Sequence, residues 1–126
     1  MIKFGIFLFP ISLIIAKVAN HIINNPRPFV VENFTPLISH AADNGFPSDH
    51  VLLVSALAAV VTPFSRKWSL VLWFITIFVA ISRVETGVHH AADVIGSIII
   101  SILVAGMIYF FSKNKSNAAD SNPEYK

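Results

Sequence analysis

The chain contains no cysteine. This absence excludes disulfide bonds and metal sites built from thiolates, and it leaves the redox compartment unspecified. Charge is scarce as well, because Asp, Glu, Lys and Arg make up 13% of the residues, about half the share of roughly 25% in a soluble domain. The Lys and Arg residues form no run or stripe, so nucleic acid is not an expected partner.

Long hydrophobic runs take the place of the missing charge, since hydrophobic residues make up 55% of the chain. The runs at residues 4–23, 48–64, 69–88 and 91–111 approach the ~20 residues that cross a bilayer as a helix. The first run is similar to a secretion signal, but Lys17 interrupts the small residues that a cleavage site needs, so we expect a retained span. The sequence therefore predicts an all-α protein, a polytopic membrane helix bundle with about four transmembrane helices.

Two regions are expected along the chain. Residues 1–112 form the predicted membrane-embedded domain, whereas residues 113–126 are polar and predict a disordered cytoplasmic tail. Most basic residues fall on one side of a four-span bundle, which the positive-inside rule makes cytoplasmic. These residues are Lys3, Arg66, Lys67, Lys113, Lys115 and Lys126.

Polar side chains gather at the other ends of the apolar runs, where they are costly unless they face a shared polar site. The most informative group is Ser82-Arg83-(x5)-His89-(x3)-Asp93. His89 and Asp93 lie four residues apart, which places them on one face of a helix. We expect Asp93 to accept a hydrogen bond from His89 Nδ1, which leaves the Nε2 lone pair free to attack. The alternative, in which Asp93 only caps its own helix, remains open.

Further candidate residues lie on the same predicted outer side. The guanidinium groups of Arg27 and Arg83 suit a bidentate grip on phosphate oxygens, although arginines at span ends often just reach the interface. Ser48 is expected to cap a helix whose free N–H groups attract anions. His50 could protonate a departing oxygen, or it could be only an interfacial residue.

The histidines also raise the question of a metal, because the chain has five of them. No His-x3-His or His-Glu-x2-His pattern is present, so we expect no metal and no cofactor. His21 and His40 lack partners at a useful spacing, and His90 would point about 100° away from His89 on a helix. Each of the three is expected to lie at the interface, with contact to substrate as the alternative.

Taken in order, these residues resemble the type 2 phosphatidic acid phosphatase superfamily, whose pattern is Lys-x6-Arg-Pro, Pro-Ser-Gly-His and Ser-Arg-x5-His-x3-Asp. The third block is complete, and the second appears as Pro47-Ser48-Asp49-His50. Arg27-Pro28-Phe29-Val30 and the segment from His40 to His50 look most like undecaprenyl-diphosphatases of the bacitracin-resistance type. Asn20 stands where the family has its lysine, with Lys17 one helical turn away. Family members usually have six spans, so the two missing spans would precede residue 1. Three alternatives stay open: a fragment, a short variant, or a form that needs a partner copy.

The resemblance implies hydrolysis of a lipid phosphate or diphosphate, above all of undecaprenyl diphosphate, at the outer face of a bacterial plasma membrane. His89 would attack phosphorus and form a phosphohistidine, His50 would protonate the leaving group, and Asp93 would be the third catalytic residue. Expected partners are polyprenyl or other lipid phosphates, membrane lipids and further copies of the chain. The implied phosphate-binding residues are Arg27, Arg83, Ser48, Ser82 and Asp49.

Two other classes of function remain open. A truncated or degenerate protein would bind lipid phosphates without hydrolysing them, which the four spans and the replaced lysine favour. A small membrane subunit whose histidines bind haem or a metal is suggested by the histidine count alone.

Overall fold

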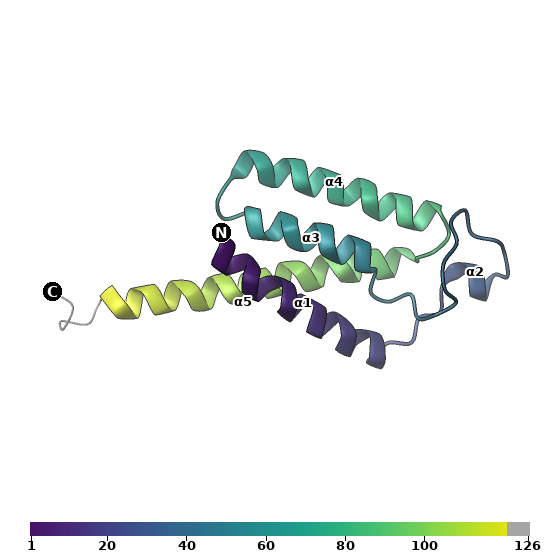
Figure 1. Ribbon diagram of the computed structural model, residues 1–126, viewed down its shortest axis with the longest axis horizontal. Helices are drawn as coiled ribbons and strands as arrows, with labels where there is room; N and C mark the ends of the chain where they lie inside the picture. The colour runs from purple at the N-terminus through teal and green to yellow at the C-terminus, as the bar shows by residue number, and fades with distance from the viewer. Residues whose placement is uncertain (121–126) are drawn as a thin grey trace.

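The structure, a computed structural model, describes residues 1–120. Within them the chain forms α1 (Ile2–Ile22), α2 (Pro28–Val31), α3 (Asp49–Val61), α4 (Arg66–Glu85) and α5 (Ala91–Asp120), and no β-strand. Figure 1 shows the four longer helices as a bundle, with α2 and its flanking loops gathered at one end. The predicted all-α class is confirmed.

The bundle combines three long helices with a shorter one. α1, α4 and the part of α5 up to Ser116 are long and apolar enough to cross a membrane. α3, the remaining expected span, has only 13 residues and therefore extends about 20 Å, whereas the hydrocarbon core is ~30 Å thick. It ends at Val61, two residues before Pro63, because proline has no backbone N–H to continue the intrahelical hydrogen bonds.

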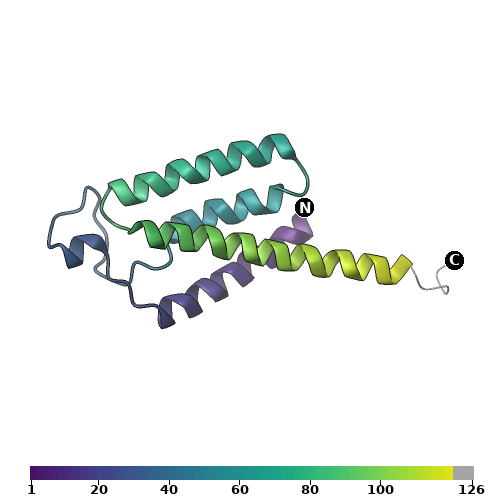
Figure 2. The same ribbon diagram turned by 180° about the vertical axis from the view of Figure 1, so that it is seen from behind.

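α3 is the centre of the packing, and it contacts α1, α4 and α5 (Figure 2). Its buried residues are mostly small, and Ala56, Ala58 and Ala59 are at most 3% exposed. Ser55 Oγ lies 2.7 Å from Ser101 Oγ on α5. Small side chains let helices approach closely, and paired hydroxyls hold them together where water is absent.

The long helices turn apolar side chains outward. Only 22% of the most hydrophobic part of α1 and 17% of that of α4 are buried inside the bundle. Such a surface is unfavourable in water but suits lipid hydrocarbon, where the helical backbone satisfies its own hydrogen bonds. The structure thus supports an integral membrane protein.

Two of the basic residues, Lys3 and Arg66, lie at the end of the bundle opposite to the loop between α1 and α3. Lys3 near the start of α1 and Arg66 at the start of α4 share the end that holds the N-terminus (Figure 1). The segment between α1 and α3 lies at the other end, beside the connection from α4 to α5.

The predicted tail differs from expectation over its first part. α5 continues through Asp120, so residues 113–120 are helical rather than disordered. Lysine and alanine in this segment are favourable helix residues, and an existing helix extends more easily than a new one forms. Residues 121–126 of the predicted tail lie outside the described part of the chain, and the boundary at residue 112 stays a prediction.

Two glycines on α5 offer a matched test of how the loop between α1 and α3 packs. A Cβ atom at Gly96 would overlap the Phe46 ring, whereas a Cβ at Gly106 would meet no atom within 4 Å. We expect Gly96→Ala to destabilise the protein by about 1–3 kcal/mol through overpacking, and Gly106→Ala to stabilise it by up to about 1 kcal/mol through helix propensity. Thermal unfolding in detergent measures both; equal midpoints would contradict the packing of Phe46 against α5.

Candidate active site

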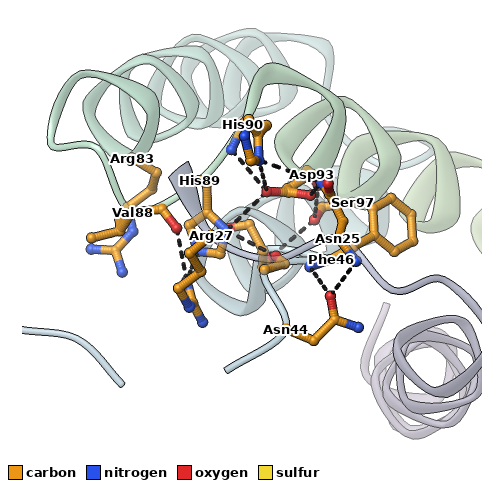
Figure 3. A network of polar contacts seen from close by, with 12 residues as sticks. Asn25, Arg27, Asn44, Phe46, Arg83, Val88, His89, His90, Asp93 and Ser97 are labelled. Carbon is orange, nitrogen blue, oxygen red and sulfur yellow. Dashed lines mark hydrogen bonds and ion pairs between the residues drawn. The ribbon is translucent and has the colours of Figure 1, made fainter. Parts of the chain in front are cut away.

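Four of the predicted site residues, Arg27, Arg83, His89 and Asp93, lie together at the loop end of the bundle (Figure 3). Arg27 comes from the loop after α1, and Ser48 precedes α3. Arg83 lies in the last turn of α4, His89 in the connection to α5, and Asp93 in the first turn of α5. Segments that are far apart in the sequence therefore build one polar cluster.

His89 is the centre of this cluster and is only 3% exposed. Its Nδ1 lies 2.9 Å from the Gly45 carbonyl oxygen, and its Nε2 lies 3.1 Å from Arg27 Nη1. A carbonyl can only accept and a guanidinium can only donate, so these partners place the proton on Nδ1 and leave a lone pair on Nε2. The ring is thus held as a neutral imidazole, and the nitrogen that carries the lone pair faces the guanidinium of Arg27.

Arg27 is 5% exposed, and each end of its guanidinium has partners. Nε donates to Asp43 Oδ1 at 2.7 Å, and Nη1 donates to the Val88 carbonyl at 2.9 Å. These bonds tie the loop between α1 and α3 to the connection that carries His89. A buried guanidinium held in this way is preorganised for an anion.

Asp93 is fully buried, and both its oxygens accept hydrogen bonds. Asn25 Nδ2 donates to Oδ1 at 2.6 Å, and the backbone N–H of His90 donates to Oδ2 at 2.8 Å. His89 Nδ1 lies 3.6 Å from Oδ2, beyond hydrogen-bond length. His89 Nδ1 therefore donates to the Gly45 carbonyl rather than to Asp93, which was the expected acceptor. Asp93 caps the start of α5 and lies beside the imidazole.

Three buried polar atoms around the site have no hydrogen-bond partner in the described part of the chain: Ser48 Oγ, Arg83 Nε and His40 Nδ1. Ser48 occupies the predicted N-cap position of α3, but its side chain makes no capping hydrogen bond. Leaving a buried donor unpaired costs about 1–3 kcal/mol. Such a set of free donors beside a buried arginine suits a phosphate, whose oxygens only accept.

The remaining predicted residues are more exposed. His50 lies exposed in the first turn of α3, near enough to Arg83 and His89 to feel their charge. Ser82 is exposed on α4, and its hydroxyl makes no hydrogen bond to another described residue. The structure therefore brings His50 to the edge of the cluster and does not bring Ser82 into it.

Asp49 lines a polar cavity of about 410 Å³ beside α1, which adjoins the cluster because Arg27 and Asp43 also line it. Asn20 also lines this cavity. Its side-chain amide donates to the Phe46 backbone carbonyl at 2.7 Å, and its backbone carbonyl accepts from Asn44 Nδ2 at 2.6 Å. Asn20 thus holds the loop between α1 and α3 in place, whereas Lys17 forms part of the cavity wall. The polar residues of the wall are Lys17, Asn20, Arg27, Asp43, Asn44 and Asp49.

Four residues of the site were not predicted: Asn25, His40, Asp43 and Gly45. Asn25 and Gly45 act on Asp93 and His89, and the His40 ring lies 6.1 Å from the His89 ring between centroids. Three of them fall within residues 40–50. The family resemblance of this segment was the one feature of the sequence that could have pointed to them. The role of Asn25 was overlooked because an Asn-Asn pair after a helix is a common signal for the end of that helix.

Asp43 and His40, in the loop between α1 and α3, both have a pKa below the ordinary value. Burial raises the pKa of the Asp43 carboxyl, but the hydrogen bond and charge of Arg27 outweigh it, so the pKa lies below its usual value. Burial, followed by the charge of Arg27, holds the pKa of His40 below its usual value. At neutral pH, Asp43 is therefore an anion and His40 a neutral imidazole.

No metal was expected from the sequence. Among residues 1–120, no group of three or more His, Cys, Asp or Glu side chains is arranged to hold a metal ion. The charge that faces His89 comes instead from arginine.

Comparison with known proteins gives the same family as the motifs. The model of the PAP2 superfamily matches residues 4–117. The Bacillus subtilis (strain 168) protein called undecaprenyl-diphosphatase BcrC is 37% identical over 89 residues, which cover 69% of this chain and 45% of that protein. The Bacillus licheniformis protein called bacitracin transport permease protein BcrC is 32% identical, over 87% of this chain and 55% of that protein.

A solved structure agrees with the fold. The transmembrane PAP2 type phosphatidylglycerolphosphate phosphatase from Bacillus subtilis superposes with a TM-score of 0.67 at 26% identity, over 87% of this chain and 58% of that one. The chain spans about half the length of the curated relatives it matches. Since the family model covers nearly all of the described helices, the chain belongs to the PAP2 superfamily.

Proposed function

We propose that this protein hydrolyses a lipid diphosphate, with undecaprenyl diphosphate as the substrate and undecaprenyl phosphate and phosphate as products. The curated relatives called undecaprenyl-diphosphatase support this substrate class. The observation that carries the proposal is the state of His89: its proton is held on Nδ1 by the Gly45 carbonyl, and its Nε2 faces the buried Arg27.

The proposed reaction begins when His89 Nε2 attacks the terminal phosphorus. The bond from phosphorus to the leaving oxygen breaks as His50 donates a proton to that oxygen. Water, deprotonated by His50, then attacks the phosphohistidine and releases phosphate. In the free protein Arg27 Nη1 lies on the Nε2 lone pair, so an arriving phosphate would draw this donor onto its own oxygens and free the nucleophile.

The phosphate oxygens would be held by groups that lack other partners. Arg83 Nε and Ser48 Oγ are buried and unpaired, and Arg27 contributes its guanidinium. Ser82, which is exposed in the structure, would contact substrate from the rim. Asp49, the first residue of α3, would contribute its backbone N–H rather than its carboxylate, because a carboxylate repels phosphate oxygens. Preorganised donors of this kind stabilise the charge that develops on the equatorial oxygens of the transition state.

The site is proposed to face outward from a bacterial plasma membrane. The positive-inside rule supports this orientation, because Lys3, Arg66 and Lys67 lie at the end opposite to His89. Membrane lipids are the expected surroundings, and association with further copies of the chain stays a prediction.

A second candidate is a protein that binds lipid diphosphate without turning it over. Two observations favour it: the chain matches about half the length of its relatives, and Arg27 covers the nucleophilic nitrogen of His89.

The test is phosphate release from undecaprenyl diphosphate by the purified protein in EDTA, with undecaprenyl phosphate as a parallel substrate. We expect release from the diphosphate, with EDTA leaving the rate unchanged because histidine and arginine perform the chemistry. Binding of the lipid without release would instead support the second candidate.

A further inference from the structure

His40 is a half-buried histidine that the reaction described above does not use. It lies in the loop before α3, and its ring approaches the His89 ring edge-on, with centroids 6.1 Å apart and an interplanar angle of 77°. Its Nδ1 is buried and has no hydrogen-bond partner among the described residues. A ring that served only to support the loop would be expected to use this atom in a hydrogen bond.

The charges around His40 define what it can bind. Burial lowers its pKa, and Arg27 and more weakly Arg83 lower it further. The Ala41 backbone and Asp43 act in the opposite direction but are outweighed. His50 also lies near enough to interact with it electrostatically. His40 is thus a neutral donor placed among fixed positive charges, which is a setting for an anion rather than for a cation.

We propose that His40 is a third substrate-contacting imidazole, whose Nδ1–H donates to a non-bridging oxygen of the phosphoryl group that His89 attacks. This assignment rests on the proposed function and gives the histidines separate tasks. His89 forms the bond to phosphorus, His50 moves the proton, and His40 binds the phosphoryl oxygen without adding charge. An arriving phosphate would fill the vacant hydrogen-bond position on Nδ1 together with those on Arg83 and Ser48.

Isosteric substitutions test which nitrogen matters. In His40→Asn the side-chain amide can occupy the place of Nδ1, whereas in His40→Gln it reaches the place of Nε2. His40→Ala removes both. We expect His40→Ala and His40→Gln to lower kcat/KM about 10²-fold, as for the loss of one oxyanion donor, and His40→Asn to retain most of the activity. Ser39→Ala, an exposed neighbour in the same loop, is the matched control.

Direct binding of orthovanadate, followed by ⁵¹V NMR line broadening, separates this inference from the proposed function. Vanadate resembles pentacoordinate phosphorus, so its affinity should fall at least about tenfold in His40→Ala and recover in His40→Asn. Unchanged vanadate affinity in His40→Ala would overturn the inference, as would equal losses in all three variants with a lowered unfolding midpoint. If the wild type binds vanadate but releases no phosphate, the proposed function fails while the role of His40 is still decided.

Discussion

Replacing His89 with alanine is expected to reduce phosphate release from undecaprenyl diphosphate by at least about 10³-fold, because it removes the proposed nucleophile. No other described side chain is held as His89 is, with one ring nitrogen bonded to a carbonyl and the other facing a guanidinium. The variant should still bind the lipid, since the arginines remain. Initial rates at saturating substrate, together with a lipid-binding isotherm, measure the two effects separately.

A matched histidine and a trapped intermediate complete this test. His21→Ala changes an exposed histidine in the last turn of α1 and should leave the rate unchanged. Rapid quenching of the wild type with substrate labelled in its terminal phosphate should yield an acid-labile phosphoprotein, which His89→Ala should not form. A labelled protein in the alanine variant would assign the nucleophile to another residue.

Replacing Arg27 with lysine is expected to lower kcat/KM about 10²–10³-fold while the positive charge is retained. The guanidinium reaches Asp43, the Val88 carbonyl and His89 at once. A single ammonium group cannot reproduce this fork, so both the grip on phosphate and the tie between loop and connection should weaken. The measurement is kcat/KM together with the thermal unfolding midpoint.

Asp43→Asn serves as the control for the structural part of that effect. It keeps an oxygen that can accept from Arg27 Nε but removes the charge, and the Asp43 side chain is 62% exposed. Because water screens the exposed carboxylate end of this ion pair and Arg27 itself is retained, the rate should change by less than about tenfold, or about 1.4 kcal/mol. If Asp43→Asn were as inactive as Arg27→Lys, Arg27 would act mainly by supporting the loop rather than by binding phosphate.

The membrane character of the protein and the identity of its reactive groups could be predicted from the sequence. Hydrophobic length is a property of each segment on its own, so the apolar runs predicted the long helices without knowledge of their packing. The spacing of Arg83, His89 and Asp93 across a short connection likewise predicted that they would meet. The length of α3 was less predictable. A helix too short to cross the bilayer is stable only because neighbouring helices pack against it, and the sequence of the segment does not show that packing.

Only the tertiary structure decided which atoms hold His89 and which remain free. The Gly45 carbonyl that fixes its tautomer is 44 residues away, and the Asn25 amide that bonds Asp93 is 68 residues away. The residue type does not predict either hydrogen bond, because any backbone carbonyl can accept one and any asparagine can end a helix. The sequence by itself determined the chemical groups and their order; the path of the loop over the ends of α4 and α5 determined their partners, since contacts between distant segments depend on the fold as a whole.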